Sequence, residues 1–293
     1  MILSYHAGRK NATIARCAAI WYAERMEKTD AIKKLLSGYA LTPNRALGQN
    51  FLADEAALTA IAAAATSENL PVLEIGPGLG ALTRALCLRA PQVVAIEKDA
   101  KLAAILPQLV PEENLTVITG DALKEDILSA MGHAPFAVAG NLPYYITTPI
   151  SERLICLRPE SLTFLVQKEA AARYFAGPKE EVYGPLAVLS QVFYAPEKLM
   201  DVPRASFYPV PNVDSLAVRL APKKDAPQGG AAPFFHFLNR AFAMRRKTFQ
   251  NNFRGEAGVL DALSELHLAD NVRAEALEPE ALFALYRLLC SAK

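Results

Sequence analysis

The sequence predicts an α/β protein in which a mostly parallel sheet, covered by helices on both faces, precedes a small all-helical domain. Short apolar runs alternate with helical segments between residues 71 and 177, which is typical of a parallel sheet. Residues 221–233 are rich in proline, glycine and alanine, as in a linker. Beyond them the apolar residues have helical spacing without a strand pattern.

The individual elements follow from these patterns. Five strands are predicted at residues 71–75, 92–97, 114–120, 135–140 and 161–167. Helices are predicted at residues 81–90, 99–110, 168–177, 184–194, 234–253 and 280–289. Two later strands, 197–202 and 214–220, are joined by the proline-rich loop "PRASFYPVPN", so we expect an antiparallel pair at the sheet edge.

Composition excludes several classes of protein. The chain has 293 residues, a net charge of +1, and no apolar run of the ~18 residues that a membrane span needs. Its four cysteines (Cys17, Cys87, Cys156 and Cys290) form no CxxC pair and have no histidine at ligand spacing. We therefore expect neither a disulfide framework nor a metal site, and a cytoplasmic location without membrane attachment.

The first 25 residues differ from the rest. They carry Arg9, Lys10 and Arg16 but no acidic residue before Glu24, as in an organellar transit peptide. We favour a different interpretation, in which translation starts at Met26, so residues 1–40 are treated as an N-terminal extension, either a misassigned start or a targeting segment.

Three strand ends suggest a nucleoside pocket, because ligands of open α/β sheets bind beyond the carboxyl ends of the strands. The turn "GPGLG" begins at Gly76 and would let the backbone approach a ligand closely. Glu97, 21 residues later, is placed to bind ribose hydroxyls, and Asp121 is placed to bind an exocyclic amine. A plain tight turn and two helix-capping acids would explain the same residues. NAD and S-adenosylmethionine both contain adenosine, so both remain open here.

A fourth strand end carries "NLPY", residues 141–144. The Asn141 side-chain oxygen and the Leu142 carbonyl could accept the two N–H bonds of a nucleobase amine, a poor nucleophile. Pro143 would fix the direction of that carbonyl, and Tyr144 offers a face for an extruded base. Phe207 is a candidate for the second face. The alternative is that residues 141–144 form a simple turn, because Asn and Pro are both common in turns.

A basic segment without acids follows the linker. Five cationic residues lie between Pro233 and Arg254, where they could contact RNA phosphates: Arg240, Arg245, Arg246, Lys247 and Arg254. An ordinary solvated helix face is the alternative.

Taken together, these motifs resemble the ribosomal RNA adenine N6-dimethyltransferases, most of all those acting on small-subunit (16S) ribosomal RNA. Beyond the motifs already quoted, the resemblance includes "LGQNFL" (47–52), "LVQKEAAAR" (165–173) and "FYPVPNVDSLAVRL" (207–220). It implies a Rossmann-like S-adenosylmethionine-dependent methyltransferase sheet in a catalytic domain (41–222), a linker (223–233) and an RNA-contacting helical domain (234–293). "TPNRA", before "GQNFL", has fewer basic residues than is usual in the family.

The resemblance also implies roles for single residues. Asn50 and Leu52 would close over the cofactor, Gly76 would lie beneath it, and Asn141 would face both the cofactor and the target amine. Glu97 would take the ribose and Asp121 the adenine amine. The implied reaction dimethylates two adjacent adenosines in the terminal hairpin of the small-subunit RNA, on immature subunits during ribosome biogenesis, and we expect a monomer.

Three rival functions remain at this stage. A large-subunit RNA adenine dimethylase of the macrolide-resistance type would share the cofactor motifs and the "NLPY" clamp. An NAD-dependent oxidoreductase is disfavoured by the GxGxG spacing and by the lack of a plausible catalytic His, Lys or Tyr set. A non-catalytic assembly or transcription factor on the same fold is the third rival.

Overall fold

A computed structural model describes residues 28–228 and 230–290 of the chain. The predictions for the first 25 residues therefore lie outside the described part. Among the residues that are described, no helix is both long and apolar enough to cross a membrane.

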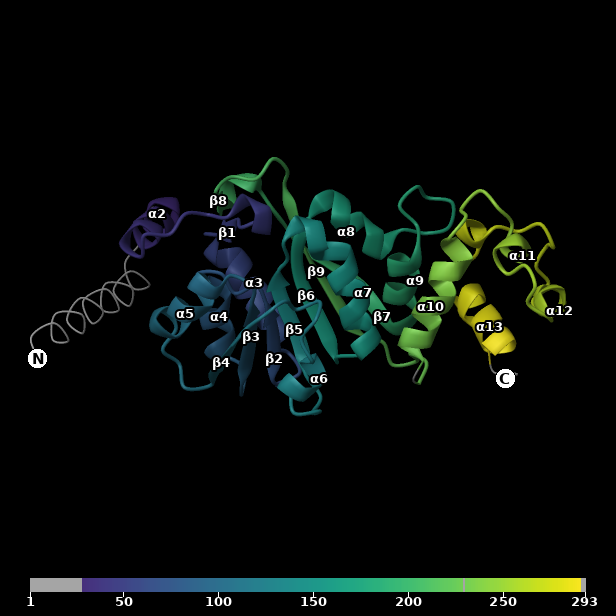
Figure 1. Cartoon of the computed structure of the whole chain (residues 1–293), viewed down its shortest axis with the longest axis horizontal. Coiled ribbons are helices and arrows are strands. Elements are labelled where there is room, and N and C mark those ends of the chain that lie inside the picture. The colour runs from purple at the N-terminus through teal and green to yellow at the C-terminus, as the bar shows by residue number, and fades with distance from the viewer. Residues whose placement is uncertain (1–27, 229, 291–293) are drawn as a thin grey trace, which may run out of the picture.

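A seven-stranded sheet forms the centre of the protein (Figure 1). Its strands, in spatial order, are β4 (Leu115–Thr119), β3 (Val93–Glu97), β2 (Val72–Ile75), β5 (Ala137–Asn141), β6 (Ser161–Gln167), β9 (Ser215–Pro222) and β7 (Tyr194–Val202). The first five are parallel, and β9 pairs antiparallel with both β6 and β7. The predicted α/β fold with an antiparallel edge pair is therefore confirmed.

Helices pack on both faces because successive strand residues point to opposite sides. Val93 and Ala95 belong to one buried cluster, whereas Val94 and Ile96 belong to the other. The first cluster is shared with α2 (Lys28–Gly38), α3 (Glu55–Ala65), α4 (Ala81–Cys87) and α5 (Ala100–Leu109). The second includes residues of α6 (Ile127–Ala130), α7 (Thr147–Leu157), α8 (Lys168–Phe175) and α9 (Pro185–Phe193).

A second, two-stranded sheet lies at the same edge as the predicted ligand site. It pairs β1 (Phe51–Leu52) with β8 (Phe207–Tyr208), so that Leu52 lies opposite Phe207. The pairing brings the "GQNFL" segment against the proline-rich loop, although about 150 residues separate the two in sequence. The predicted elements did not include this pair, because two-residue strands leave no periodic pattern.

The helix predicted over residues 234–253 is divided in two. The chain forms α10 (Ala231–Phe242) and then, after a turn, α11 (Phe249–Asn252). The Asn252 amide explains the break, since it donates to the Ala241 carbonyl at 3.0 Å and accepts from the Met244 N–H at 3.1 Å. Thr248 caps the second piece by accepting from the Asn251 N–H. Arg245, Arg246 and Lys247 consequently lie in a turn and not on a helix face.

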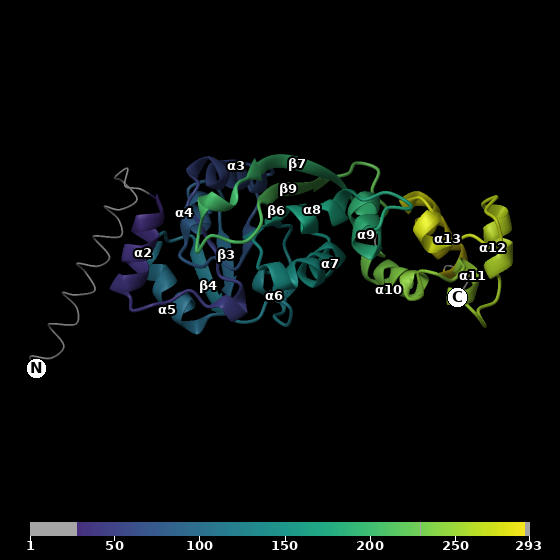
Figure 2. The same ribbon diagram turned by 90° about the horizontal axis from the view of Figure 1, so that it is seen from above.

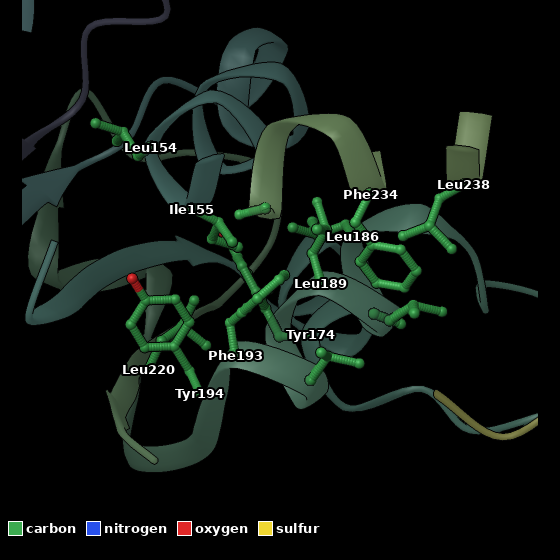
Figure 3. Packing of buried hydrophobic residues seen from close by; sticks show 14 of the residues in the cluster. Leu154, Ile155, Tyr174, Leu186, Leu189, Phe193, Tyr194, Leu220, Phe234 and Leu238 are labelled. Atoms are coloured by element: carbon green, nitrogen blue, oxygen red, sulfur yellow. The ribbon is translucent and has the colours of Figure 1, made fainter. Parts of the chain in front are cut away.

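The C-terminal helices share a core with the sheet. Buried residues of α10, α12 (Val259–Glu265) and α13 (Pro279–Cys290) belong to the same cluster as those of β6 and α9. The ring of Phe234 lies 6.1 Å from that of Phe193 of α9, in edge-to-face geometry, and Figure 3 shows both residues. It also lies 5.0 Å from the ring of Phe283 of α13, again edge to face. Figures 1 and 2 show α11–α13 at the end of the molecule opposite α2.

Phe234 connects α9, which covers the sheet, to α13 of the C-terminal helices. We predict that Phe234→Ala lowers the free energy of unfolding by about 3–5 kcal/mol, because it removes a fully buried ring and leaves a cavity. Urea denaturation followed by circular dichroism measures this change. Leu260→Ala, on the exposed side of α12, is the control and should change stability by no more than about 0.5 kcal/mol. Equal effects of the two substitutions would contradict the shared core.

Candidate active site

A cavity of about 390 Å³ opens at the carboxyl ends of the parallel strands β2, β3, β4 and β5. All the predicted cofactor residues line it: Asn50, Leu52, Gly76, Glu97, Asp121 and Asn141. Leu142, Pro143 and Tyr144 also line it. The wall opposite the strands is formed by the "GQNFL" segment and by Ala31 and Ile32 of α2.

The glycine turn forms the floor of this cavity. Gly76, Gly78 and Gly80 all have positive φ angles, of 68°, 59° and 82°, which favour glycine. A Cβ at Gly80 would lie 2.6 Å from the Val110 side chain, so glycine is needed there for close packing. At Gly76 a Cβ would meet no atom within 4 Å, because this position faces open space. A ligand can therefore approach the Gly76 backbone directly.

Glu97 is a buried carboxylate, 6% exposed, that two backbone groups orient. Its Oε2 accepts from the Gly78 N–H at 3.0 Å, and its Oε1 accepts from the Asp99 N–H at 2.8 Å. Burial raises the pKa of Glu97, while these two hydrogen bonds act in the opposite direction. Each carboxylate oxygen retains acceptor capacity, which suits a pair of ribose hydroxyls.

Asp121 is paired with Lys98, a residue that sequence reasoning did not single out. The ammonium group lies 3.0 Å from Oδ2, and the Leu123 N–H donates to Oδ1 at 3.0 Å. The hydrogen bond with Lys98 is the main reason why the pKa of Asp121 is lowered. The carboxylate is therefore an ionised acceptor at the rim of the cavity.

The Asn141 amide has a defined orientation. Its Nδ2 donates to the Asn50 main-chain carbonyl at 2.9 Å, and the Asn50 side chain in turn donates to the Gly48 carbonyl at 3.1 Å. The nearby Gln49 Nε2 donates to Asp99 at 3.0 Å, which ties the same segment to the end of β3. This contact through one N–H fixes the orientation of the Asn141 amide, and its Oδ1 is available as an acceptor at the cavity.

The Leu142 carbonyl provides a second acceptor beside it. The Leu142 N–H donates to the Leu165 carbonyl of β6, whereas no described residue donates to the Leu142 oxygen. Pro143 follows with φ −57°, and its own carbonyl accepts from the Ile146 N–H and the Thr147 hydroxyl. These contacts hold the turn rigid, so the two acceptors have a fixed relation to the sheet.

Of the two aromatic residues predicted to hold the base, Tyr144 lies at the cavity and Phe207 does not. Tyr144 lines the cavity with its hydroxyl buried, and this burial raises its pKa. Phe207, in contrast, is 0% exposed and packs in the core, because β8 pairs with β1 and turns the ring inward. It offers no open face to the cavity in this structure. Tyr145, which sequence reasoning missed, also lines the cavity and is 50% exposed. Its position directly after "NLPY" was the available signal.

The predicted RNA-contacting residues fall into two groups. Arg240 pairs with Glu256 at 2.9 Å and lies over the ring of Phe253, while Arg245 pairs with Glu275 at 3.3 Å. Both acids lie outside the acid-free segment, which is why the sequence pattern did not reveal them. The remaining three cations are exposed, and no ion pair joins them to another described residue: Arg246, Lys247 and Arg254.

Comparisons with known proteins agree with this geometry. Ribosomal RNA small subunit methyltransferase A of Deinococcus radiodurans is 42% identical over 252 residues, covering 83% of this chain and 85% of that protein. The enzyme of the same name from Bacillus licheniformis is 37% identical over 272 residues, covering 86% and 93%.

Two solved structures have the same fold. A dimethyladenosine transferase from Plasmodium falciparum matches with a TM-score of 0.66 and 27% identity, over 80% of this chain and 95% of that one. The 23S rRNA methyltransferase ErmE matches with a TM-score of 0.61 and 30% identity, over 82% and 99%. The family described as ribosomal RNA adenine dimethylase matches residues 40–290. The chain belongs to the ribosomal RNA adenine dimethylase family.

Proposed function

We propose that this protein transfers methyl groups from S-adenosylmethionine to N6 of two adjacent adenosines in the 3′-terminal hairpin of small-subunit ribosomal RNA, giving N6,N6-dimethyladenosine. Family membership and the relatives named small subunit methyltransferase A support this function. The observation that carries it is the Asn141 amide, whose nitrogen is held by Asn50 and whose oxygen remains an acceptor at the cavity.

The cavity residues fit S-adenosylmethionine. The Gly76 backbone is open to close approach, the Glu97 carboxylate can accept from ribose hydroxyls, and Asp121 can accept from the adenine amine. Asn50 and Leu52 cover the opposite side of the cavity. When bound, S-adenosylmethionine supplies an electrophilic methyl group on a positively charged sulfur.

The chain's own contribution to catalysis is to hold the target amine. Asn141 Oδ1 and the Leu142 carbonyl can each accept one N–H of adenine N6, which draws electron density onto the nitrogen. As the nitrogen becomes tetrahedral, the same acceptors stabilise its developing positive charge, and one N–H proton then passes to solvent. Tyr144 stacks on the extruded base, an interaction worth ~1–3 kcal/mol per base, and thereby offsets part of the unstacking cost.

The rival functions are less well supported. ErmE has a similar fold, so architecture does not separate the two ribosomal substrates. The small-subunit assignment is favoured because the small-subunit methyltransferases A match at 37–42% identity, compared with 30% for ErmE. A host expressing this chain should therefore remain susceptible to macrolides. An NAD-dependent oxidoreductase is not favoured, because the chain belongs to the adenine dimethylase family.

The exposed cations Arg246, Lys247 and Arg254 are our candidates for RNA phosphate contacts. They precede or follow α11 in turns of the chain, and Figure 1 shows α11 at the end of the molecule away from α2. We further propose that the protein acts as a cytoplasmic monomer on immature small subunits, and that residues 234–293 serve as its RNA-contacting domain.

The clamp on the amine can be tested by removing it. Asn141→Ala should lower methyl transfer to immature small subunits by about 10²–10³-fold, because one acceptor for the reacting amine is lost. Radioactive methyl incorporation, with mass mapping of the modified bases, measures the change. Gln108→Ala, which removes an exposed side-chain amide from α5 outside both the cavity and the helical domain, is the matched control and should keep full activity. A fully active Asn141→Ala protein would contradict the clamp, whereas a lack of methyl transfer by the unaltered protein would support the non-catalytic assembly factor.

The basic turn can be tested through its salt dependence. Substituting both Arg246 and Lys247 by alanine should weaken RNA binding and lower the slope of log K against log[salt] by about two, because each phosphate contact releases about one counterion. Filter binding over a salt series measures the slope. Arg89→Ala with Lys101→Ala removes the same charge from exposed positions near α4 and α5 and should leave the slope unchanged. If both double variants behave alike, the turn does not contact RNA.

A further inference from the structure

Glu74 is a buried acid at the proposed cofactor site to which the mechanism above gives no role. It lies in β2, beside Ala95 of β3 and Ala139 of β5 in the strand register. Its side chain is 1% exposed, yet it lines the cavity together with the glycine turn. The carboxyl group is therefore shielded from bulk water but borders the space that a ligand would fill.

Arg84 and Lys98 line the same cavity as Glu74, but neither is among the groups that shift the pKa of Glu74. Its Oε2 is buried and has no hydrogen-bond partner among the described residues. The Thr83 hydroxyl of α4 is also buried and also lacks a hydrogen-bond partner there.

Among titratable groups, the Glu97 carboxylate of β3 raises the pKa of Glu74. Glu74 and Glu112 in turn raise the pKa of the nearby Cys87 thiol of α4. α3, on the same face, buries apolar residues such as Ala57 and Ile61, and its exposed Glu55 also lines the cavity. No salt bridge joins Glu74 to a described cation.

These surroundings favour the neutral acid. Burial is the main reason why the pKa of Glu74 is raised to about 8. The Thr83 hydroxyl, a possible donor to the carboxylate, acts in the opposite direction, and the nearby Glu97 carboxylate raises the pKa further. At pH 7 the free protein therefore holds a proton on Glu74. A cation placed in the same cavity would reverse this preference, because opposite charges attract strongly where water is excluded.

We propose that Glu74 senses the charge of the cofactor: it is protonated in the free protein and ionises when a ligand with a positively charged sulfonium fills the cavity. The carboxyl O–H bond breaks, the proton passes to solvent, and the carboxylate balances the sulfonium charge. When methyl transfer leaves a neutral thioether, Glu74 takes up a proton again. The residue thereby favours S-adenosylmethionine over S-adenosylhomocysteine. The inference rests on the proposed function, because that function supplies the cationic ligand.

Proton release can be measured directly. Isothermal titration of the full-length protein at pH 7, in phosphate and in Tris, separates proton release from binding heat. S-adenosylmethionine should release between about half a proton and one proton, whereas S-adenosylhomocysteine should release almost none. Any proton that Glu97 exchanges on contact with the ribose appears with both ligands, so it cancels in the difference.

Proton release on binding also makes the affinity for S-adenosylmethionine depend on pH. Because the bound state carries fewer protons, the dissociation constant for S-adenosylmethionine should fall by about tenfold per unit rise in pH between about pH 6 and 7.5, and level off above the free-state pKa of about 8. The dissociation constant for S-adenosylhomocysteine should stay flat over this range.

Two variants identify the proton's source. Glu74→Gln should abolish both the proton release and the pH dependence, whereas Glu112→Gln, which alters a carboxylate near α4 outside the cavity lining, should keep both. S-adenosylmethionine binding without proton release, or unchanged release by Glu74→Gln, would overturn the inference and leave the proposed function intact. A complete lack of S-adenosylmethionine binding would overturn both. If Glu74→Gln does not fold, the difference in proton release between S-adenosylmethionine and S-adenosylhomocysteine, measured on the unaltered protein, still tests the inference.

Discussion

The site depends on one hydrogen bond, from the Asn141 amide nitrogen to the main-chain carbonyl of Asn50, 91 residues earlier in the chain. This bond fastens the "GQNFL" segment over the cavity and orients the amide at the same time. An amide held through one of its two N–H groups has a fixed orientation, so its oxygen can be presented as the acceptor that a nucleobase amine requires. The same hydrogen bond therefore covers the cofactor cavity and orients the group that binds the target adenosine.

Charge is distributed unevenly over this nearly neutral chain. The cavity gathers Glu74, Glu97 and Asp121, with Lys98 as the partner of Asp121. The exposed cations near α11 lie at the other end of the molecule (Figure 1). The cavity lining has more acids than bases, with Glu55, Glu74, Glu97 and Asp121 against Arg84 and Lys98, which suits a cationic small molecule. Exposed cations suit a phosphate backbone. The net charge of +1 reveals neither surface, because it counts the acidic and basic residues of the whole chain together.

Sequence patterns predicted the sheet and much of the cavity for a simple reason: the carboxyl ends of adjacent parallel strands meet at one edge. Gly76, Glu97, Asp121 and Asn141 each end or follow a strand, so their convergence could be foreseen. Phe207 could not be placed, because its inward orientation comes from pairing with a two-residue strand. The break after Phe242 and the ion pairs of Arg240 and Arg245 depend on Asn252, Glu256 and Glu275, which are contacts of the folded chain. Glu74 was hidden within an apolar strand.

The most direct test is the structure of the protein with its RNA hairpin and a cofactor analogue that cannot transfer a methyl group. The account predicts that the target adenine is extruded against Tyr144. Its N6 should lie about 2.7–3.2 Å from both Asn141 Oδ1 and the Leu142 carbonyl oxygen. An amine held by other groups, or an Asn141 amide turned so that its nitrogen faced the base, would contradict the central claim.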